Sequence, residues 1–548
     1  MAVVKLGRKE MPSGYNAGDF QYMGRPSIAQ GDFGADVGIA DMACVDQFGT
    51  SNTSKGYHGG VVQDTKGAWW VYLEWGRIQP GKSWVNGSFR GQDFQFVQCG
   101  SETEARSCFA KQIKSKNTAR LSQKDVGGTL IWAAQAGKDG YIIQSLATRE
   151  RGLPDAYSIK DDSGVRAALT APKKTTPKKS ARTFHSEVLS LASSLVGGTQ
   201  SYTRALSQAS GVVPTMASIV QVREQLIPAA LTRIQAVGND IMAQVSDSGL
   251  KDISKMAYAM VPRMIPRTGL TPEDAILSTN NISLLQQDLD AFEASLKNED
   301  FSVEGVQSEV DPHALLNAQV DWLDPDSDLG RWVANTFNSM SNNRHGHLRG
   351  QLRIKRMFTV ERPDRDARFK AAVAKMAASH PHGLNNPVPA GLQPARRPDL
   401  GDLGDLAAKA NVFFGVHGTR SVNVAPILGS HFRLPQSLKG VHITGAAFGS
   451  GVYAATDHKK AHGYVSGNNS YYGGSGGIAG RGWFMFLCDV VGGQFYYPTS
   501  AWGIGAVCPG GGDSVYAHPS RISSLANDEH VVFNPDHMRI RYIIEGEG

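Results

Sequence analysis

The stretch NVFFGVHGTRSVNVAPILGSHFRLP covers residues 411–435, and TGAAFGSGVYAATDHKKAHGY covers residues 444–464. In the first stretch the apolar run VFF has the length of a short buried strand, and His417 follows it closely. In the second stretch a glycine-flanked turn leads into Tyr453, at the start of another expected strand. Glu529 stands far downstream, at the head of a third apolar run. An acid in that place requires a structural or functional reason.

These residues, in this order, resemble the catalytic domain of the poly(ADP-ribose) polymerases, whose His-Tyr-Glu triad matches His417, Tyr453 and Glu529. The family's His-Gly-Ser-Arg reads His-Gly-Thr-Arg here, so that Thr419 keeps the hydroxyl, and its second stacking tyrosine falls on Tyr464. Its Asn-Glu-Tyr reads Asp-Glu-His around the acid. A single histidine or tyrosine in such segments is more often a core residue. The shared order of all the motifs favours an ADP-ribosyltransferase fold.

The resemblance implies that NAD is a substrate, consumed by breaking the bond between nicotinamide and its ribose. By the same resemblance, Gly418 offers backbone groups to the nicotinamide carboxamide, while Tyr453 and Tyr464 stack on its ring. His417 would bind a hydroxyl of the adenine-side ribose. Glu529 would stabilise the positive charge that develops on the other ribose and would orient the acceptor.

Two further positions complete the expected NAD site. Thr419 belongs to the expected NAD-binding set, and Arg433 is the best candidate for a contact with the phosphates or the adenosine. Ala461 stands where relatives have a serine that bonds the carboxamide. One such hydrogen bond contributes about 0.5–1.5 kcal/mol, so we expect weaker NAD binding here but not the loss of catalysis.

Composition limits the class of protein. A chain of 548 residues holds about three or four domains, and its net charge of +6 permits an acidic partner without demonstrating one. The five cysteines form no CxxC pair and no Cys/His ligand spacing, so we expect no metal site. No apolar run approaches the roughly 18 residues of a membrane helix. We therefore expect a soluble intracellular protein without membrane contact.

The N-terminal third resembles a second domain of the same family. A strand ending in Trp75-Gly76-Arg77, a further strand and then a helix resemble the WGR domain of DNA-dependent members. The resemblance implies DNA contacts by Trp75, Gly76, Arg77 and Lys116. A chance tripeptide on a hairpin is the alternative. Relatives carry an aromatic that stacks on a DNA end where Ala119, Arg120 and Leu121 stand here, which puts that contact in doubt.

The expected fold is multidomain α+β: a small sheet-plus-helix WGR domain, an all-α regulatory bundle and a mixed α+β ADP-ribosyltransferase domain. The regulatory bundle has a generic helical spacer as its alternative. The basic linker is equally a nuclear localisation signal, a nucleic-acid tether or a plain connection. The expected boundaries are a Gly-rich, disordered N-terminus at 1–60, the WGR domain at 61–160, the basic linker at 161–184, the regulatory helices at 185–300 and the catalytic domain at 310–548.

The sequence thus predicts an NAD-dependent protein poly(ADP-ribosyl)transferase stimulated by DNA breaks, with protein acceptors that include itself. One alternative is a mono-ADP-ribosyltransferase without DNA control, and another is a DNA-binding protein with an inactive transferase domain. We expect the nucleus as its location, or the cytoplasm or nucleoid for a bacterial or viral source. The acceptor residue, the DNA lesion, the source organism and the oligomeric state stay open.

Overall fold

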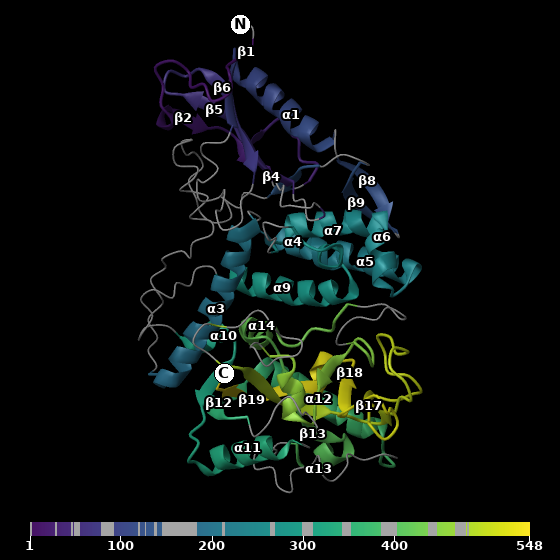
Figure 1. The fold of residues 1–548 in the computed structure, drawn as a ribbon. Coiled ribbons are helices and arrows are strands. Elements are labelled where there is room, and N and C mark those ends of the chain that lie inside the picture. Colours follow the sequence, from purple (N-terminus) through teal and green to yellow (C-terminus); the bar gives the residue numbers. More distant parts are fainter. Residues whose placement is uncertain are drawn as a thin grey trace. The chain divides into compact units, whose positions relative to one another are not determined.

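A computed structural model gives the fold of this chain as two compact units (Figure 1). The first unit comprises Met1–Lys173 and Thr203–Leu285, and the second comprises Lys174–Tyr202 and Gln286–Gly548. The structure describes residues 3–27, 30–44, 48, 55–77, 93–118, 121–126, 128–135, 140–144, 183–210, 214–263, 269–298, 311–341, 352–384, 403–436, 446–465, 478 and 482–547. The basic tract at 171–182, Ala119 and Arg120 therefore lie outside the described residues.

The first unit begins with a mostly antiparallel sheet in the order β1-β7-β6-β5-β4-β10, with β2 paired to β5 and β3 to β4. One face packs on α1, and the other is covered by aromatic residues that include Phe20 and Phe96. The elements are β1 (Val4–Lys5), β2 (Phe20–Tyr22), β3 (Arg25–Pro26), β4 (Val37–Cys44), β5 (Lys55–Asp64), β6 (Trp69–Arg77), β7 (Asp93–Cys99), α1 (Glu102–Thr118) and β10 (Ile142–Gln144).

The expectation of a disordered N-terminus at 1–60 is wrong. All eight residues of β4 are buried, and β4 pairs with β5 inside the sheet. The glycines that suggested disorder allow close packing instead. A Cβ on Gly38 would meet the Met23 carbonyl oxygen at 1.8 Å, and one on Gly60 would meet the Tyr22 ring at 2.5 Å. Glycine is needed where backbone and ring approach so closely.

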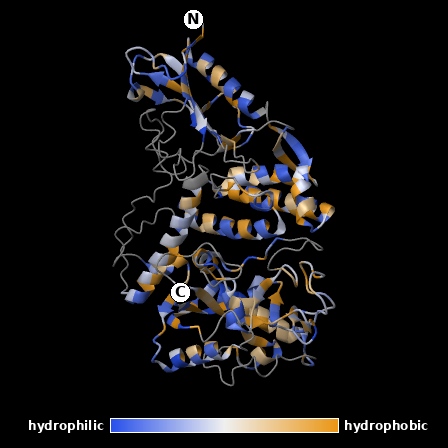
Figure 2. Cartoon of the chain, in the orientation of Figure 1, coloured by the Kyte–Doolittle hydropathy of each residue, from blue (hydrophilic) through white to orange (hydrophobic). Residues whose placement is uncertain are grey.

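The rest of the first unit is a hairpin and a set of helices. The hairpin consists of β8 (Leu121–Val126) and β9 (Thr129–Ala134), and Lys124 pairs with Asp252 of α7 at 2.7 Å. The segment from residue 185 onward is helical, as its hydrophobic period predicted. It belongs partly to the first unit and partly to the second. The helices are α4 (Met216–Gln221), a π-helical turn (Val222–Leu226), α5 (Ile227–Val237), α6 (Ile241–Ser246), α7 (Ser248–Met260) and α8 (Pro272–Ala275), and Figure 2 shows both hydrophilic and hydrophobic residues in this helical region.

Two long helices contribute to both units. In α3 (Ser186–Ser210) residues up to Tyr202 belong to the second unit, and in α9 (Thr279–Lys297) residues from Gln286 onward do. Val188, Leu191 and Leu195 of α3 are fully buried in the same core as strands of the second unit. This part of α3 therefore belongs to the hydrophobic core of the second unit.

The second unit has an antiparallel sheet in the order β11-β12-β19-β15-β13 and a smaller sheet in the order β14-β18-β17-β16. A bridge between Val416 and Ala455 joins the two. The strands are β11 (Gln319–Trp322), β12 (Ile354–Glu361), β13 (Val412–Gly418), β14 (Val452–Ala454), β15 (Phe484–Val491), β16 (Phe495–Tyr496), β17 (Ser514–Ala517), β18 (Glu529–Val532) and β19 (Met538–Gly546).

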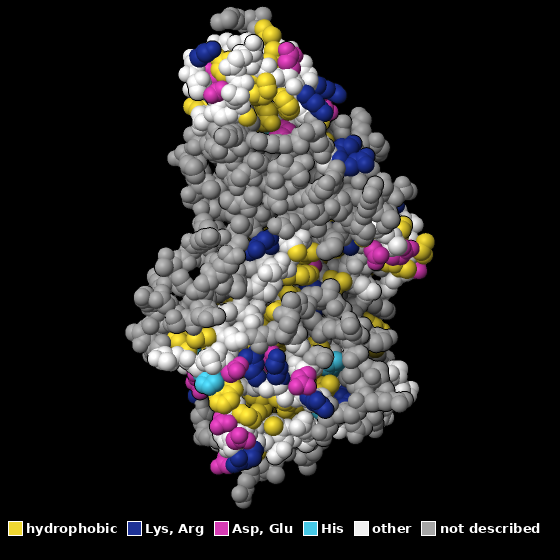
Figure 3. Space-filling model, turned by 60° about the vertical axis from the view of Figure 1, so that its left-hand side comes forward, with side chains coloured by type: hydrophobic (Ala, Val, Ile, Leu, Met, Phe, Trp, Pro, Cys, Tyr) yellow, Lys and Arg dark blue, Asp and Glu magenta, His cyan; other side chains and the backbone are white. Residues whose placement is uncertain are grey.

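Consecutive residues of the larger sheet face opposite sides, as strand geometry requires. On β13, Phe413 belongs to the same core as residues of α3 and α14, whereas Phe414 packs on Trp332 of α11 with ring centroids 5.7 Å apart. The helices of this unit are α10 (Pro312–Leu316), α11 (Asp328–Ser339), α12 (Pro363–Ser379), α13 (Gly404–Lys409), α14 (Val424–Ser430) and α15 (His458–His462). On the face drawn in Figure 3, basic and acidic side chains of this unit lie beside one another, so their charges partly offset. The chain is thus mixed α+β.

None of the described helices is long and apolar enough to cross a membrane. Within the described residues, no group of three or more His, Cys, Asp or Glu side chains is placed to hold a metal ion.

Candidate active site

Three strands of the second unit bring the predicted triad together. His417 lies near the end of β13, Tyr453 is the middle residue of β14, and Glu529 begins β18. Strands β14 and β18 are paired, with Tyr453 opposite Val531. The bridge between Val416 and Ala455 brings the end of β13 beside β14. The topology therefore places all three side chains at the junction of the two sheets.

His417 is held as a neutral imidazole with one fixed tautomer. Its Nδ1 lies 2.9 Å from the carbonyl oxygen of Tyr453. A carbonyl only accepts, so Nδ1 carries the proton and Nε2 keeps a lone pair. Burial lowers the pKa of His417, and the bond to Tyr453 opposes this only in part. The ring can therefore accept a hydrogen bond from a hydroxyl through Nε2.

The hydroxyl of Tyr453 closes the glycine-flanked turn that precedes it. It donates to the Gly449 carbonyl at 2.9 Å and accepts from the Phe448 backbone N–H at 2.8 Å. Burial and the negative charge of Glu529 hold the pKa of Tyr453 well above its usual range. Tyr453 therefore stays a neutral phenol, and its fixed ring is suited to stacking rather than to proton transfer.

Glu529 is paired with Lys460 of α15, a contact that the sequence interpretation missed. The side chains of Lys460 and Glu529 are 14% and 13% exposed. Asp457 caps α15 by accepting from the backbone N–H groups of Lys459 and Lys460, at 2.7 and 3.2 Å. The cap fixes the start of the short helix that presents Lys460. The sequence offered one indication of this contact, because Lys460 stands four residues before Tyr464, a residue that the resemblance assigns to the site.

Gly418 is required by the close approach of α15. A Cβ at this position would meet the Ala461 carbonyl oxygen at 1.9 Å. Ala461 itself is 3% exposed and packs in the core beside Val416 and Leu487. Tyr464 lies two residues after the end of α15 and is half-buried, and it is close enough to Tyr453 to make a small contribution to the raised pKa of that tyrosine. Gly418 and Tyr464 thus lie beside the triad.

Thr419 and Arg433 make contacts away from the triad. The Thr419 hydroxyl is buried and accepts from the Asn423 amide at 3.4 Å. Arg433 pairs with two carboxylates of α9, Asp290 at 3.1 Å and Glu293 at 2.8 Å. The arginine expected to contact NAD is therefore held by a helix of the segment expected to be regulatory.

A buried network next to the triad also binds α9. Arg420, which is 3% exposed, donates to Asp288 at 2.8 Å and to Gln287 at 3.0 Å. Tyr202 of α3 donates to the same Asp288 carboxylate at 3.0 Å. The residue that ends the His-Gly-Thr-Arg motif is thus an anchor for α3 and α9.

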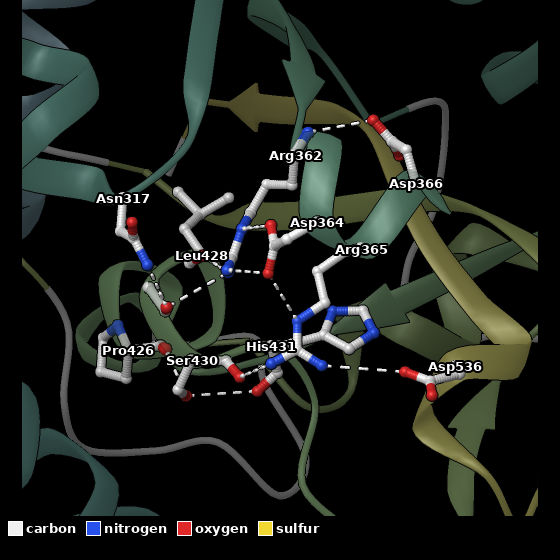
Figure 4. Close-up of polar contacts among 11 residues, drawn as sticks. Asn317, Arg362, Asp364, Arg365, Asp366, Pro426, Leu428, Ser430, His431 and Asp536 are labelled. Atoms are coloured by element: carbon white, nitrogen blue, oxygen red, sulfur yellow. Dashed lines mark hydrogen bonds and ion pairs between the residues drawn. The ribbon is translucent and has the colours of Figure 1, made fainter. Parts of the chain in front are cut away.

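The C-terminal end of α14 is fixed by polar contacts before the chain reaches Arg433 (Figure 4). Arg362 donates to the carbonyl oxygens of Leu428 and Gly429, and Asn317 also donates to Gly429 at 2.9 Å. Cationic donors at the last carbonyls of a helix satisfy groups that lack partners within the helix. His431, just beyond, donates from Nε2 to the Pro535 carbonyl at 3.0 Å. The base of the segment that carries Arg433 is therefore well supported.

Residues 331–547 match the family model of the poly(ADP-ribose) polymerase catalytic domain. The match contains the triad and the whole of the expected NAD-binding set. It does not extend to residues 1–330. No curated protein matches the chain.

Outside the match to the polymerase catalytic domain, two of the residues expected to bind DNA, Trp75 and Lys116, contact the buried ring of Tyr57. The Trp75 ring stacks on Tyr57 with centroids 6.4 Å apart and an interplanar angle of 21°. The Lys116 ammonium lies 5.1 Å from the centroid of the same ring. Arg77 ends β6 opposite Lys55 and is exposed, and Gly76 lies opposite Gly56. The first unit therefore carries aromatic rings and cations on neighbouring strands and the end of α1.

Proposed function

We propose that this chain is an NAD-dependent ADP-ribosyltransferase that transfers ADP-ribose to protein acceptors, itself included, and releases nicotinamide. The observation that carries the proposal is the placement of Glu529 beside His417 and Tyr453 within a segment that matches the polymerase catalytic domain. Burial lowers the pKa of His417 and raises that of Tyr453, so both of these side chains are neutral near pH 7. NAD is a substrate here, and the transfer needs no metal.

The chemistry follows from the states of these side chains. The bond between the nicotinamide nitrogen and the ribose carbon breaks, the nicotinamide leaves with the electron pair, and positive charge develops on the ribose. The Glu529 carboxylate stabilises that charge, because a fixed charge in a water-poor site acts more strongly than one in water. Lys460 holds Oε1 of this carboxylate. Oε2 then accepts from a ribose hydroxyl or takes the proton of the attacking acceptor.

The binding of NAD is assigned to the neighbouring groups. Nε2 of His417 would accept a hydrogen bond from a ribose hydroxyl. The Tyr453 ring would stack on one side of the nicotinamide, and Tyr464 would lie on the other side of the nicotinamide. Gly418 has no side chain that could block the approach of nicotinamide to its backbone. The space that a Cβ on Gly418 would fill is occupied by the Ala461 carbonyl. Arg433 would bind the phosphates after release from its carboxylate partners.

We further propose that DNA breaks stimulate the enzyme, that it extends chains of ADP-ribose, and that it acts in the nucleus during the response to DNA damage. The exposed Arg77 and the half-buried Trp75 and Lys116 support a DNA-binding surface of WGR type, since aromatic rings and cations are what nucleic acids bind. The contacts of Arg433 and Arg420 with α9 support a regulatory role for the helices. In a bacterial or viral source, the location would be the cytoplasm or nucleoid.

Two alternative functions are each favoured by a separate observation. The first is an inactive transferase domain on a DNA-binding protein, which the pairing of Arg433 with α9 and the presence of Ala461 favour. The second is a mono-ADP-ribosyltransferase without DNA control. It is favoured by the departures at Ala119–Leu121, where an aromatic that stacks on DNA is lacking.

One experiment separates these functions. The purified chain is incubated with labelled NAD, with and without nicked DNA, beside a Glu529→Gln variant. We expect a ladder of labelled protein only with DNA, and none from the variant. A single adduct that does not depend on DNA supports mono-ADP-ribosylation. No incorporation under any condition supports the inactive domain.

A further inference from the structure

Asp528, the residue before Glu529, is a buried carboxylate that accepts from two hydroxyl groups. Its Oδ1 accepts from Thr456, and its Oδ2 accepts from the Tyr516 hydroxyl at 2.9 Å. The residue is 8% exposed. A carboxylate in such a place must have its oxygens satisfied, and both of these are.

The two donors belong to different parts of the second unit. Tyr516 lies in β17, which pairs with β18, so its bond stays within the smaller sheet. Thr456 follows β14 and comes directly before Asp457, the cap of α15. The bond from Thr456 therefore joins Asp528 to the start of the helix that carries Lys460.

This helix and the start of β18 are thus joined at two consecutive residues. Asp528 binds Thr456, and Glu529 binds Lys460. The helix α15 is only five residues long, and so short a helix does not keep its direction without outside contacts. The position of Lys460, and with it that of the Glu529 carboxylate, depends on what holds the first turn of α15.

We propose that Asp528 is a positioning residue, which acts through Thr456 to set the placement of the Glu529–Lys460 pair and thereby the rate of ADP-ribose transfer. The effect on rate rests on the proposed function, because Glu529 is the catalytic carboxylate only in that function. The placement of the pair does not rest on it. The two parts can therefore be tested separately.

The neighbouring histidine does not replace Asp528 in this role. His530 is 1% exposed, and its ring stacks on Tyr516 with centroids 4.0 Å apart. Among the described residues, neither of its ring nitrogens has a hydrogen-bond partner. Burial lowers the pKa of His530 to about 4, so the ring is neutral near pH 7. It supplies no charge and no bond to the helix.

The two hydroxyl donors provide a matched pair of variants. Thr456→Val and Tyr516→Phe each remove one hydrogen bond to Asp528 and leave the carboxylate in place. We expect Thr456→Val to lower kcat for nicotinamide release about tenfold, with KM for NAD within about twofold, since small misplacements of a reacting group are costly. Tyr516→Phe should change kcat by no more than about twofold. Thr456→Ser, which restores the hydroxyl, should recover the rate.

A second measurement does not depend on activity. The reactivity of Lys460 towards a brief pulse of an acylating reagent, read by mass spectrometry, should rise about threefold in Thr456→Val and stay unchanged in Tyr516→Phe. An unchanged Lys460 reactivity in Thr456→Val overturns the positioning role, as do equal losses of kcat in the two variants. If the wild-type chain releases no nicotinamide, the proposed function falls. A rise in Lys460 reactivity would then still support the placement of the pair by Asp528.

Discussion

Releasing Arg433 from α9 should increase the affinity of the enzyme for NAD. The change is the double variant Asp290→Asn and Glu293→Gln, which keeps the shape of both side chains and removes both charges. In the structure these carboxylates lie 3.1 and 2.8 Å from the Arg433 guanidinium, whose side chain is 35% exposed. An NAD phosphate that binds Arg433 must displace them. The variant removes that cost.

The size of the effect follows from the exposure of the two pairs. Partly exposed ion pairs contribute about 0.2–1 kcal/mol each, so the two together oppose NAD by about 0.4–2 kcal/mol. Because about 1.4 kcal/mol corresponds to a factor of ten, KM for NAD should fall by about two- to thirtyfold, with kcat little changed. The assay is steady-state release of nicotinamide without DNA, over a range of NAD concentrations.

Asp288→Asn is the matched control on the same helix. Asp288 binds the buried Arg420 at 2.8 Å, so its loss leaves a buried charge poorly compensated and should destabilise the protein by about 3 kcal/mol. It should not lower KM. If the double variant is folded and its KM is unchanged, then Arg433 does not contact NAD and the reasoning is refuted.

Four further predictions concern other parts of the chain. Glu529→Gln should retain NAD binding, measured by calorimetry, but lose chain extension, and polymer formed at the wild-type rate would refute the assignment. Ala461→Ser should tighten inhibitors that mimic nicotinamide by a factor of about two to ten, through one hydrogen bond to the carboxamide; unchanged affinity would show that this side chain does not face the ring. Arg77→Ala should lower stimulation by nicked DNA and leave basal activity intact, and an unchanged DNA response would exclude it from the DNA surface. His530 has a depressed pKa of about 4 in the folded chain, so its contribution to stability is present above about pH 6.5 and is lost as the pH falls towards 4. When the pH is lowered from about 7.5 to about 5, the free energy of unfolding of the wild type should therefore fall by about 2 kcal/mol more than that of His530→Phe, as measured by urea unfolding. Equal losses in the two proteins would contradict a buried, neutral His530.

The core of the site was predictable because its signals are local. His417 and Tyr453 each follow a glycine-bearing turn or a short apolar run, and such patterns fix strand ends within a few residues. Glu529 precedes a β-branched run in the same way. The structure places all three at the junction of two sheets.

The side-chain partners were not predictable from local pattern. Lys460 binds a carboxylate 69 positions away, and Arg433 binds one 143 positions away. Nothing within a few residues of either side chain indicates which distant group will meet it. The family resemblance assigned Arg433 to NAD and indicated no pairing with α9. In the structure, Arg433 instead pairs with carboxylates of α9.

The expected domain boundaries differ from the two compact units where they were based on composition. Glycines in the first 60 residues suggested a loose tail, but Gly38 and Gly60 lie where strands and a tyrosine ring meet. The helical period of α3 was clear, yet nothing in it showed that Leu191 and Leu195 belong to the core of the second unit. A deletion of residues 185–300 would therefore expose that core. Removing 203–285 and rejoining the helix ends is the better test of regulation.

The strand order of the second unit also has a consequence for biosynthesis. Strand β19 ends at Gly546 and lies in the middle of the larger sheet, between β12 and β15. Until residues 538–546 have left the ribosome, β12 and β15 have no partner on their inner sides, and such open strand edges invite aggregation. The second unit must therefore complete its fold after translation has passed this strand. A nascent chain stopped even a few residues short of β19 should depend on chaperones to stay unaggregated.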